Sequence, residues 1–143
     1  ATDGVGDTMT FTGATSTCGD LARLGLLVLD EGEWDGTQVV SEGWIQRSTF
    51  PSQELNPAYG YLWWLNRPGG IALEGVGGHG DELAPDVDLE MVAAVGLGGQ
   101  ILAVFPTEGI VVTRMSSDDD GPPFSARDIA VAIDAARTHG RSG

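Results

Sequence analysis

The sequence predicts an α+β fold in which helices flank an antiparallel sheet. Helical patterns stand near both ends of the sequence, while strand patterns follow one another between them. Consecutive strands without intervening helices favour antiparallel pairing over repeated strand–helix–strand units. The 143 residues are 41% hydrophobic and include four tryptophans, so residues 1–143 provide one segment of domain size with a hydrophobic core.

The first helix is predicted over residues 18–31. Thr17 and Asp20 form a capping-box pattern at its start, and the apolar residues that follow repeat on one face until Gly32. Asp35–Gly36 then indicates a turn. A helix and a turn therefore open the predicted fold. Residues 1–13, rich in Thr, Gly and Asp, are predicted to form an exposed arm or the tail of an element that begins earlier.

A shorter helix and an aromatic strand are predicted next. Ser41 is a good N-cap for a helix that continues to about Ser48 and ends before Pro51. The aromatic and β-favouring run Tyr59–Asn66 predicts a strand that is buried on both faces. Successive side chains of a strand alternate between faces, so the rings of Trp63–Trp64 would lie on opposite sides, with core packing favoured for both.

The second half of the chain predicts the main sheet and a last helix. Residues 67–90 are rich in glycine and acidic residues, which predicts an irregular insertion with one short strand at most. Apolar, β-branched runs then predict antiparallel strands over residues 91–95, 100–105 and 110–115. Ser125 and Asp128 form a second capping box, and an apolar stripe extends the last predicted helix to about His139.

The charge of the chain excludes two classes of partner. Seven arginines, no lysine and 21 acidic residues give a net charge of -14, which repels nucleic acids and anionic membrane surfaces. No apolar run reaches the ~20 residues that a membrane span needs, and the N-terminus lacks the pattern of a signal peptide. We expect a chain that binds neither nucleic acid nor membrane. The composition leaves its compartment open.

Three loop motifs are similar to cofactor or metal sites, but none of them has the context that such a site needs, so we expect neither a cofactor nor a metal. Residues 75–80 match the string G-x-G-x-x-G, but they lack the preceding strand and the following helix that a dinucleotide site needs. Residues 79–82 offer one histidine and two carboxylates without a fixed geometry. Residues 116–121 superficially resemble the start of a twelve-residue calcium loop. However, its first ligand position is Ser116, and its twelfth holds Arg127 where a bidentate Glu is needed.

Two features leave alternatives open. Cys18 is the single cysteine and stands at a helix start, where a packing thiol is favoured over a catalytic one. A small cysteine-dependent enzyme remains an alternative. The glycines of Gly96-Leu97-Gly98-Gly99 interrupt a predicted strand. Either another molecule approaches this backbone closely, or the glycines form a β-bulge at a sheet edge.

Four blocks of the sequence, in this order, resemble the C-terminal part of the β-lactamase-related serine hydrolases. The blocks are residues 16–36, 40–45, 59–64 and 96–100, the last accompanied by Pro106. The resemblance extends from about Phe11 to Arg137. The family includes class C β-lactamases, penicillin-binding DD-peptidases, serine esterases and 6-aminohexanoate-oligomer hydrolases. It implies a β-lactamase/transpeptidase-like fold, with an antiparallel sheet flanked by helices and a helical subdomain.

The resemblance implies an acyl-enzyme mechanism, but the chain lacks the catalytic groups. In the family, the Ser of an S-x-x-K motif attacks a carbonyl, while its Lys and the Tyr of a Y-x-N motif move protons. This chain has no Lys, so it cannot contain the S-x-x-K motif. Its two tyrosines, Tyr59 and Tyr61, are followed two residues later by Tyr61 and Trp63 and not by the Asn of the Y-x-N motif. No catalytic residue is therefore expected in this chain. We expect an incomplete C-terminal portion of the domain, whose partner is the N-terminal part of the same enzyme.

The family's third motif maps onto Gly96, Leu97 and Gly98. The resemblance implies that these residues and Gly99 form a strand at which substrate and oxyanion bind, with Tyr59 and Trp64 as a cleft wall. The motif's usual cation is replaced by Gly96. This favours a small-molecule ester or amide as substrate over a β-lactam. The alternative is a non-catalytic binding or structural domain of the same fold.

Overall fold

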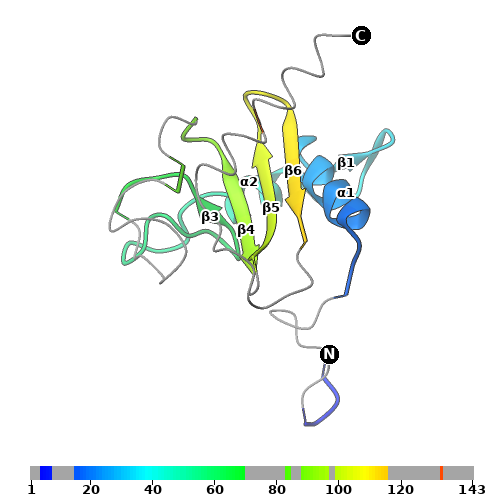
Figure 1. Ribbon diagram of the computed structural model, residues 1–143, viewed down its shortest axis with the longest axis horizontal. Helices are drawn as coiled ribbons and strands as arrows, with labels where there is room; N and C mark the ends of the chain where they lie inside the picture. The colour runs from blue at the N-terminus through cyan, green and yellow to red at the C-terminus, as the bar shows by residue number, and fades with distance from the viewer. Residues whose placement is uncertain are drawn as a thin grey trace.

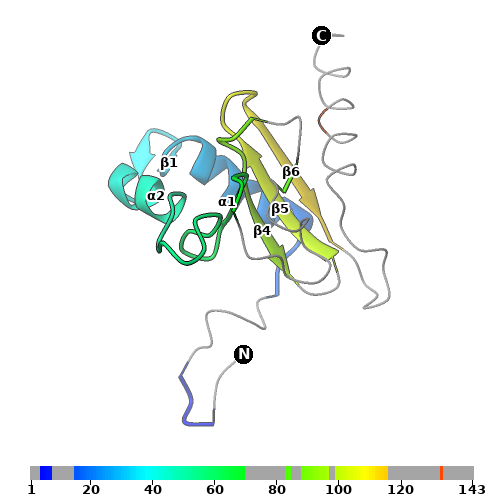
Figure 2. The ribbon, with the colours of Figure 1, turned by 90° about the vertical axis from the view of Figure 1, so that its left-hand side faces the viewer.

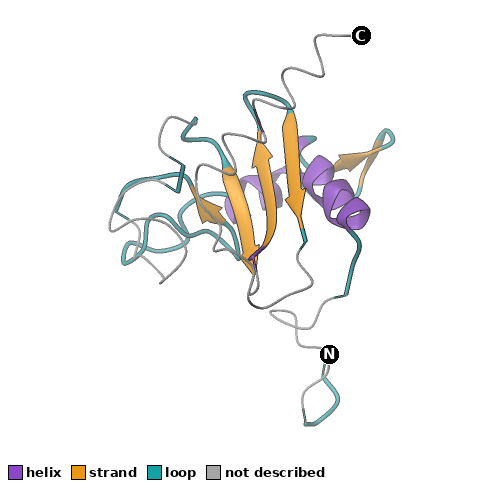
Figure 3. Cartoon of the chain, viewed as in Figure 1, coloured by secondary structure: helices purple, strands orange, loops and turns teal. Residues whose placement is uncertain are grey.

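A four-stranded antiparallel sheet organises the fold, in the order β3-β4-β5-β6 (Figure 1). In this computed structural model, residues 4–7, 15–69, 83–84, 88–96, 99–115 and 133 are described. The strands of the sheet are β3 (Trp64–Leu65), β4 (Val92–Gly96), β5 (Gln100–Phe105) and β6 (Ile110–Arg114). With two helices beside them, they form the predicted α+β fold (Figure 3).

Helix α1 (Cys18–Leu29) begins at the predicted capping box. The Asp20 N–H donates to Thr17 Oγ1 at 3.2 Å, and the Thr17 N–H donates to Asp20 Oδ2 at 3.1 Å. The hydrogen bond from the Thr17 side chain is the main reason that the pKa of Asp20 lies below its usual value; Arg23, 2.9 Å from Oδ1, adds to it. The helix ends two residues before the predicted end.

Gly25 lets α1 lie close against the sheet. It is the buried residue of the helix, and a Cβ built on it would lie 2.4 Å from Val111 Cγ1 and 2.8 Å from Leu102 Cδ1. Val111 belongs to β6 and Leu102 to β5, so the helix crosses both strands. Because real carbon–carbon contacts lie near 3.5–4.0 Å, any side chain at this position would push the helix away from the sheet.

We expect Gly25→Ala to lower the free energy of unfolding by about 1–2 kcal/mol, because overpacking exceeds the gain in helix propensity. Gly43→Ala is the matched control: Gly43 lies in the second helix with nothing within 4 Å of its added Cβ. It should raise stability by about 0.5 kcal/mol. Urea titration of both variants measures the difference, and shifts of the same sign would contradict this packing.

A hairpin and a second helix follow α1. Strands β1 (Glu33–Trp34) and β2 (Thr37–Gln38) pair around the predicted turn at Asp35–Gly36, where both φ angles are positive (50° and 74°). Such a turn suits a two-residue hairpin. Helix α2 (Glu42–Ser48) has Ser41 as its N-cap, as predicted, although the Ser41 side chain makes no capping hydrogen bond. Figure 2 shows α2 and the hairpin on one side of the sheet.

The two faces of the sheet carry separate hydrophobic clusters. On one face, Leu65, Val92, Leu102 and Val104 pack against Val28 and Leu29 of α1, together with Trp63. On the other face, Trp64 packs with Ala93, Ile101, Phe105 and Ile133. The predicted division of the tryptophan pair between opposite faces is therefore confirmed, with Trp64 buried and Trp63 half-buried.

The predicted strand over Tyr59–Asn66 is wrong in its length. Only Trp64–Leu65 forms strand β3, and Tyr59 meets Trp64 in an isolated bridge. The chain reverses between them, with Leu62 at a φ of 65° and the Gly60 N–H donating to the Trp63 carbonyl at 2.8 Å. The aromatic run therefore folds back on itself in a tight turn, which its β propensity conceals.

Buried Asn66 connects β3 to the residues that precede β4. Its side-chain amide donates to the carbonyls of Ala84 at 3.2 Å and Asp88 at 3.1 Å, and its Oδ1 accepts from the Ala84 N–H at 2.9 Å. The Asp88 carboxylate in turn accepts hydrogen bonds from the Glu90 N–H and the Thr107 hydroxyl. These two bonds lower the pKa of Asp88, and the bond from Glu90 has the larger effect. Ala84 and Asp88, in the later part of the 67–90 segment, are thus tied to the residue that follows β3.

The remaining predicted strands are confirmed, and other predictions fall outside the described residues. Strands β4, β5 and β6 occupy the predicted runs and pair antiparallel, and a turn with a hydrogen bond from the Gly109 N–H to the Pro106 carbonyl joins β5 to β6. The last predicted helix lies outside the described residues, apart from Ile133. So do most of the arm over residues 1–13 and most of the 67–90 segment. Neither described helix is long and apolar enough to cross a bilayer.

Candidate functional site

The turn between β4 and β5 contains the glycines singled out in the sequence. Gly96 is exposed at the end of β4 and pairs with Gln100 at the start of β5. Gly99 is half-buried and has a φ of 76°, a backbone conformation that favours glycine. Leu97 and Gly98 lie outside the described residues. The two described glycines thus lie at the connection that closes the β4–β5 hairpin.

The outer edge of β4 next to this turn has no partner among the described strands. Strand β3 pairs with β4 only at Val92 and Ala93, so no described strand covers the edge of Ala94–Gly96 on that side. An unpaired edge presents backbone N–H and C=O groups that another extended molecule can bind. The described residues therefore combine a glycine-bearing turn with a strand edge that no described strand covers.

Tyr59 and Trp64, the predicted cleft wall, contact each other. Their rings meet edge to face, with centroids 4.8 Å apart and an interplanar angle of 70°. Trp64 is only 9% exposed and belongs to the core cluster, while Tyr59 is half-buried and packs against that cluster. Trp64 pairs with Ala93, beside the part of the β4 edge that no described strand covers. Tyr59 is the member of the pair with more surface available to a ligand.

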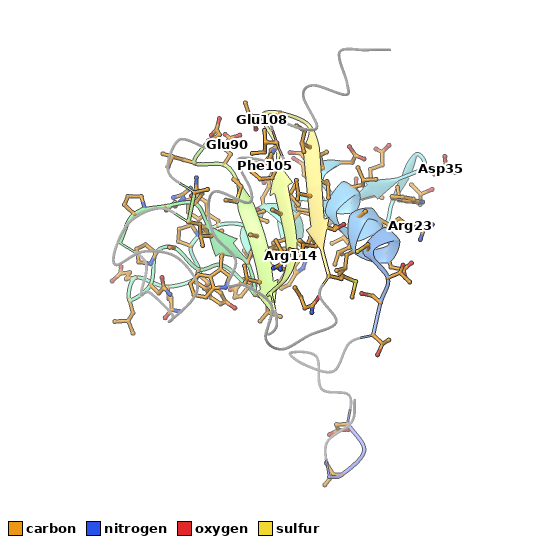
Figure 4. The ribbon with its side chains drawn as sticks, in the orientation of Figure 1. Arg23, Asp35, Glu90, Phe105, Glu108 and Arg114 are labelled. Carbon is orange, nitrogen blue, oxygen red and sulfur yellow. The ribbon has the colours of Figure 1, made fainter. Side chains whose placement is uncertain are left out.

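Sequence reasoning missed Arg114. It lies at the end of β6, and its Nη1 donates to the Gly99 carbonyl at 3.1 Å. Figure 4 shows Arg114 at the end of the sheet that bears the β4–β5 turn, far from Glu90 and Glu108 at the other end. The two residues are 15 positions apart in the sequence, so no local pattern indicates their contact.

A cavity of about 330 Å³ lies elsewhere, between the two helices and the sheet. It is lined mainly by apolar side chains, among them Val28, Ile45 and Leu65, and also by Glu90 and Pro106 near the opposite ends of β4 and β5 from the glycine turn. None of the residues proposed from the sequence lines it. It is therefore separate from the candidate site.

The described residues provide few groups for other chemistry. They contain no group of three His, Cys, Asp or Glu that could hold a metal ion. Cys18 is an exposed free thiol at the start of α1. His79 and His139, its possible partners in a cysteine-dependent reaction, lie outside the described residues, as do residues 75–80 and 116–121.

Comparison with known proteins agrees with this fold. The sequence matches the family model described as Beta-lactamase over residues 2–137. Among solved structures, the chain is similar to a putative 6-aminohexanoate-dimer hydrolase from Bacillus anthracis, with a TM-score of 0.57 and 21% sequence identity. This match covers 88% of the chain but only 30% of that hydrolase. No curated protein matches the sequence.

The chain therefore belongs to the β-lactamase-related serine hydrolase family, because the family model spans nearly its whole length. The likeness to the solved hydrolase shows that the described elements have the arrangement of that fold. Both findings confirm the resemblance and the fold class predicted from the sequence.

Proposed function

We propose that this chain is the C-terminal portion of a serine hydrolase that acts on a small ester or amide through an acyl-enzyme. In this proposal the attacking Ser, its Lys and the Tyr of the Y-x-N motif come from the N-terminal part of the same enzyme. The absence of lysine from the sequence supports this division of labour. So does the 30% share of the solved hydrolase that the chain covers.

The observation that supports the proposal most is the glycine-bearing turn, with Gly96 exposed, beside the part of the β4 edge that no described strand covers. Substrate would lie against the backbone of Gly96 and its neighbours in the motif, Leu97, Gly98 and Gly99. A backbone N–H there would stabilise the tetrahedral oxyanion, which is worth roughly 3 to 4 kcal/mol per donor in other acyl-transfer enzymes. Gly96 brings no cation to the motif, which favours an ester or amide over a β-lactam.

Exposed aromatic residues support the N-terminal part of the enzyme as a partner. Trp44 and Tyr61 stack with centroids 5.6 Å apart and planes 3° from parallel, although each is 47% exposed. Phe50 and Leu62 are also exposed, at 58% and 59%. An apolar surface of this kind is typical of an interface. The proposal places it against the missing part of the domain.

A fluorophosphonate label and a p-nitrophenyl ester assay test this function on the full-length gene product. We expect labelling of one serine outside residues 1–143 and turnover of the ester, with little or no hydrolysis of nitrocefin. The 143-residue chain alone should show neither. Turnover by that chain would defeat the proposal, and turnover abolished by a thiol reagent would favour Cys18. No labelling of the full-length product would favour a non-catalytic binding domain.

A further inference from the structure

Arg114 crosses from β6 to the turn between β4 and β5. It pairs with Ile101 in the register of the two strands, so its side chain lies on the same face of the sheet as Ile101. From there the side chain of half-buried Arg114 reaches past Gln100, and its Nη1 donates to the Gly99 carbonyl at 3.1 Å. A cationic donor makes this bond stronger than one between neutral groups.

The absent side chain of Gly99 makes room for this contact. A Cβ built on Gly99 would lie 2.4 Å from Arg114 Nη1 and 3.4 Å from its Cζ. The positive φ of Gly99 also disfavours any other residue. Glycine is therefore required at position 99 for two reasons: its positive φ angle, and the guanidinium of Arg114 that lies against it.

Arg114 differs from the other described arginines in its partner. Arg23 forms an ion pair with Asp20, while Arg47 and Arg67 lie over aromatic rings. Among the described residues no carboxylate pairs with Arg114, although the chain is strongly acidic. Among the described residues, the hydrogen bond of the Arg114 guanidinium is thus made to the turn between β4 and β5.

We propose that Arg114 is a positioning residue that fixes the peptide plane between Gly99 and Gln100. The inference depends on the proposed function, in which this turn borders the acyl pocket. A trans peptide is planar, so a carbonyl held by Arg114 directs the Gln100 N–H to the opposite side. Arg114 touches no reacting atom. It acts by holding the backbone of the turn in one orientation before substrate binds, which removes the cost of ordering it later.

A double-mutant cycle tests the contact in the 143-residue chain. Gly99→Ala should raise the unfolding equilibrium constant by on the order of tenfold more than Gly109→Ala does. Gly109 is the matched control, because it has a φ of 66° with nothing within 4 Å of its added Cβ. In an Arg114→Ala background the excess should disappear. An excess that stays the same in both backgrounds would overturn the proposal.

Kinetics of the full-length enzyme test the catalytic consequence. Arg114→Ala should lower kcat for a neutral p-nitrophenyl ester by about 10- to 100-fold with little change in KM, since misplaced groups slow the chemical step. Arg114→Lys should restore part of kcat, because an ammonium can still donate to the Gly99 carbonyl. Arg23→Ala, which removes an exposed cation on α1, should leave both constants unchanged.

The outcomes separate this inference from the proposed function. If the wild-type enzyme turns over no ester, the proposed function fails, and the positioning role fails with it whatever the cycle shows. If the wild-type enzyme is active but folded Arg114→Ala keeps the same kcat, the positioning role alone is overturned. If Arg114→Ala does not fold, the positioning role is tested by the kcat values of Arg114→Lys and Gly99→Ala. Values equal to that of the wild-type enzyme in both variants overturn the positioning role.

Discussion

Asn66→Ala is expected to lower the free energy of unfolding by about 3–5 kcal/mol. The Asn66 side chain is fully buried and makes three hydrogen bonds to backbone groups of Ala84 and Asp88. Ala84 is itself fully buried, so removing the amide leaves its N–H and C=O without this partner and without water. Orphaned buried groups cost more than the bonds they lose, since their desolvation is no longer offset. Chemical denaturation of the wild-type and variant chains measures the loss.

Two further variants make the Asn66 result specific. Gln46→Ala removes an exposed side-chain amide that bonds Glu42 at 2.8 Å, and it should cost less than about 0.5 kcal/mol. Asn66→Asp keeps the acceptor for the Ala84 N–H but loses both donors and buries a charge, so it should be as damaging as alanine. A loss below about 1 kcal/mol for Asn66→Ala would show that the 67–90 segment does not depend on this side chain.

The elements with strong local signals were predicted from the sequence. Helix α1 has its capping box and apolar stripe within one stretch of chain, and β4 to β6 are apolar runs separated by turns that contain glycine. The hairpin of β1 and β2 was missed although its turn at Asp35–Gly36 was identified. Its strands have two residues each and are exposed, so no apolar alternation indicates them.

The aromatic run was mispredicted because its conformation is set by a distant contact. The Tyr61 N–H donates to the Ser48 carbonyl at 2.9 Å, and a Cβ on Gly60 would lie 2.2 Å from that same oxygen. The run therefore folds over the end of α2. Neither the approach to α2 nor the positive φ of Leu62 can be inferred from β propensity.

The candidate site was predictable only in part for the same reason. Three glycines in a strand indicate close approach to the backbone, so the turn was visible in the sequence. The choice between a ligand and a bulge required its surroundings. The contact of Arg114 with Gly99 could not be predicted from the sequence, because the pairing of β5 with β6 brings the two residues together. Contacts made by tertiary pairing leave no periodic pattern.

Trp64→Ala is expected to lower the free energy of unfolding by about 3–5 kcal/mol, because it leaves a large cavity in the core. Trp64 is 9% exposed, packs edge to face with Tyr59, and belongs to the short strand that pairs with β4. Trp34→Ala is the control, because Trp34 lies on the β1–β2 hairpin and is 42% exposed. It should cost much less, and the same urea titration compares them.

The pair of variants also decides what Trp64 does at the candidate site. If Trp64 acts mainly through the core, Trp64→Phe should recover much of the stability, and the full-length enzyme should keep its KM for the ester. If Trp64 instead acts mainly as a cleft wall, Trp64→Ala should leave stability close to that of Trp34→Ala and raise KM. Tyr59→Phe keeps the ring that contacts Trp64, so an effect on KM without loss of stability there would assign the wall to Tyr59.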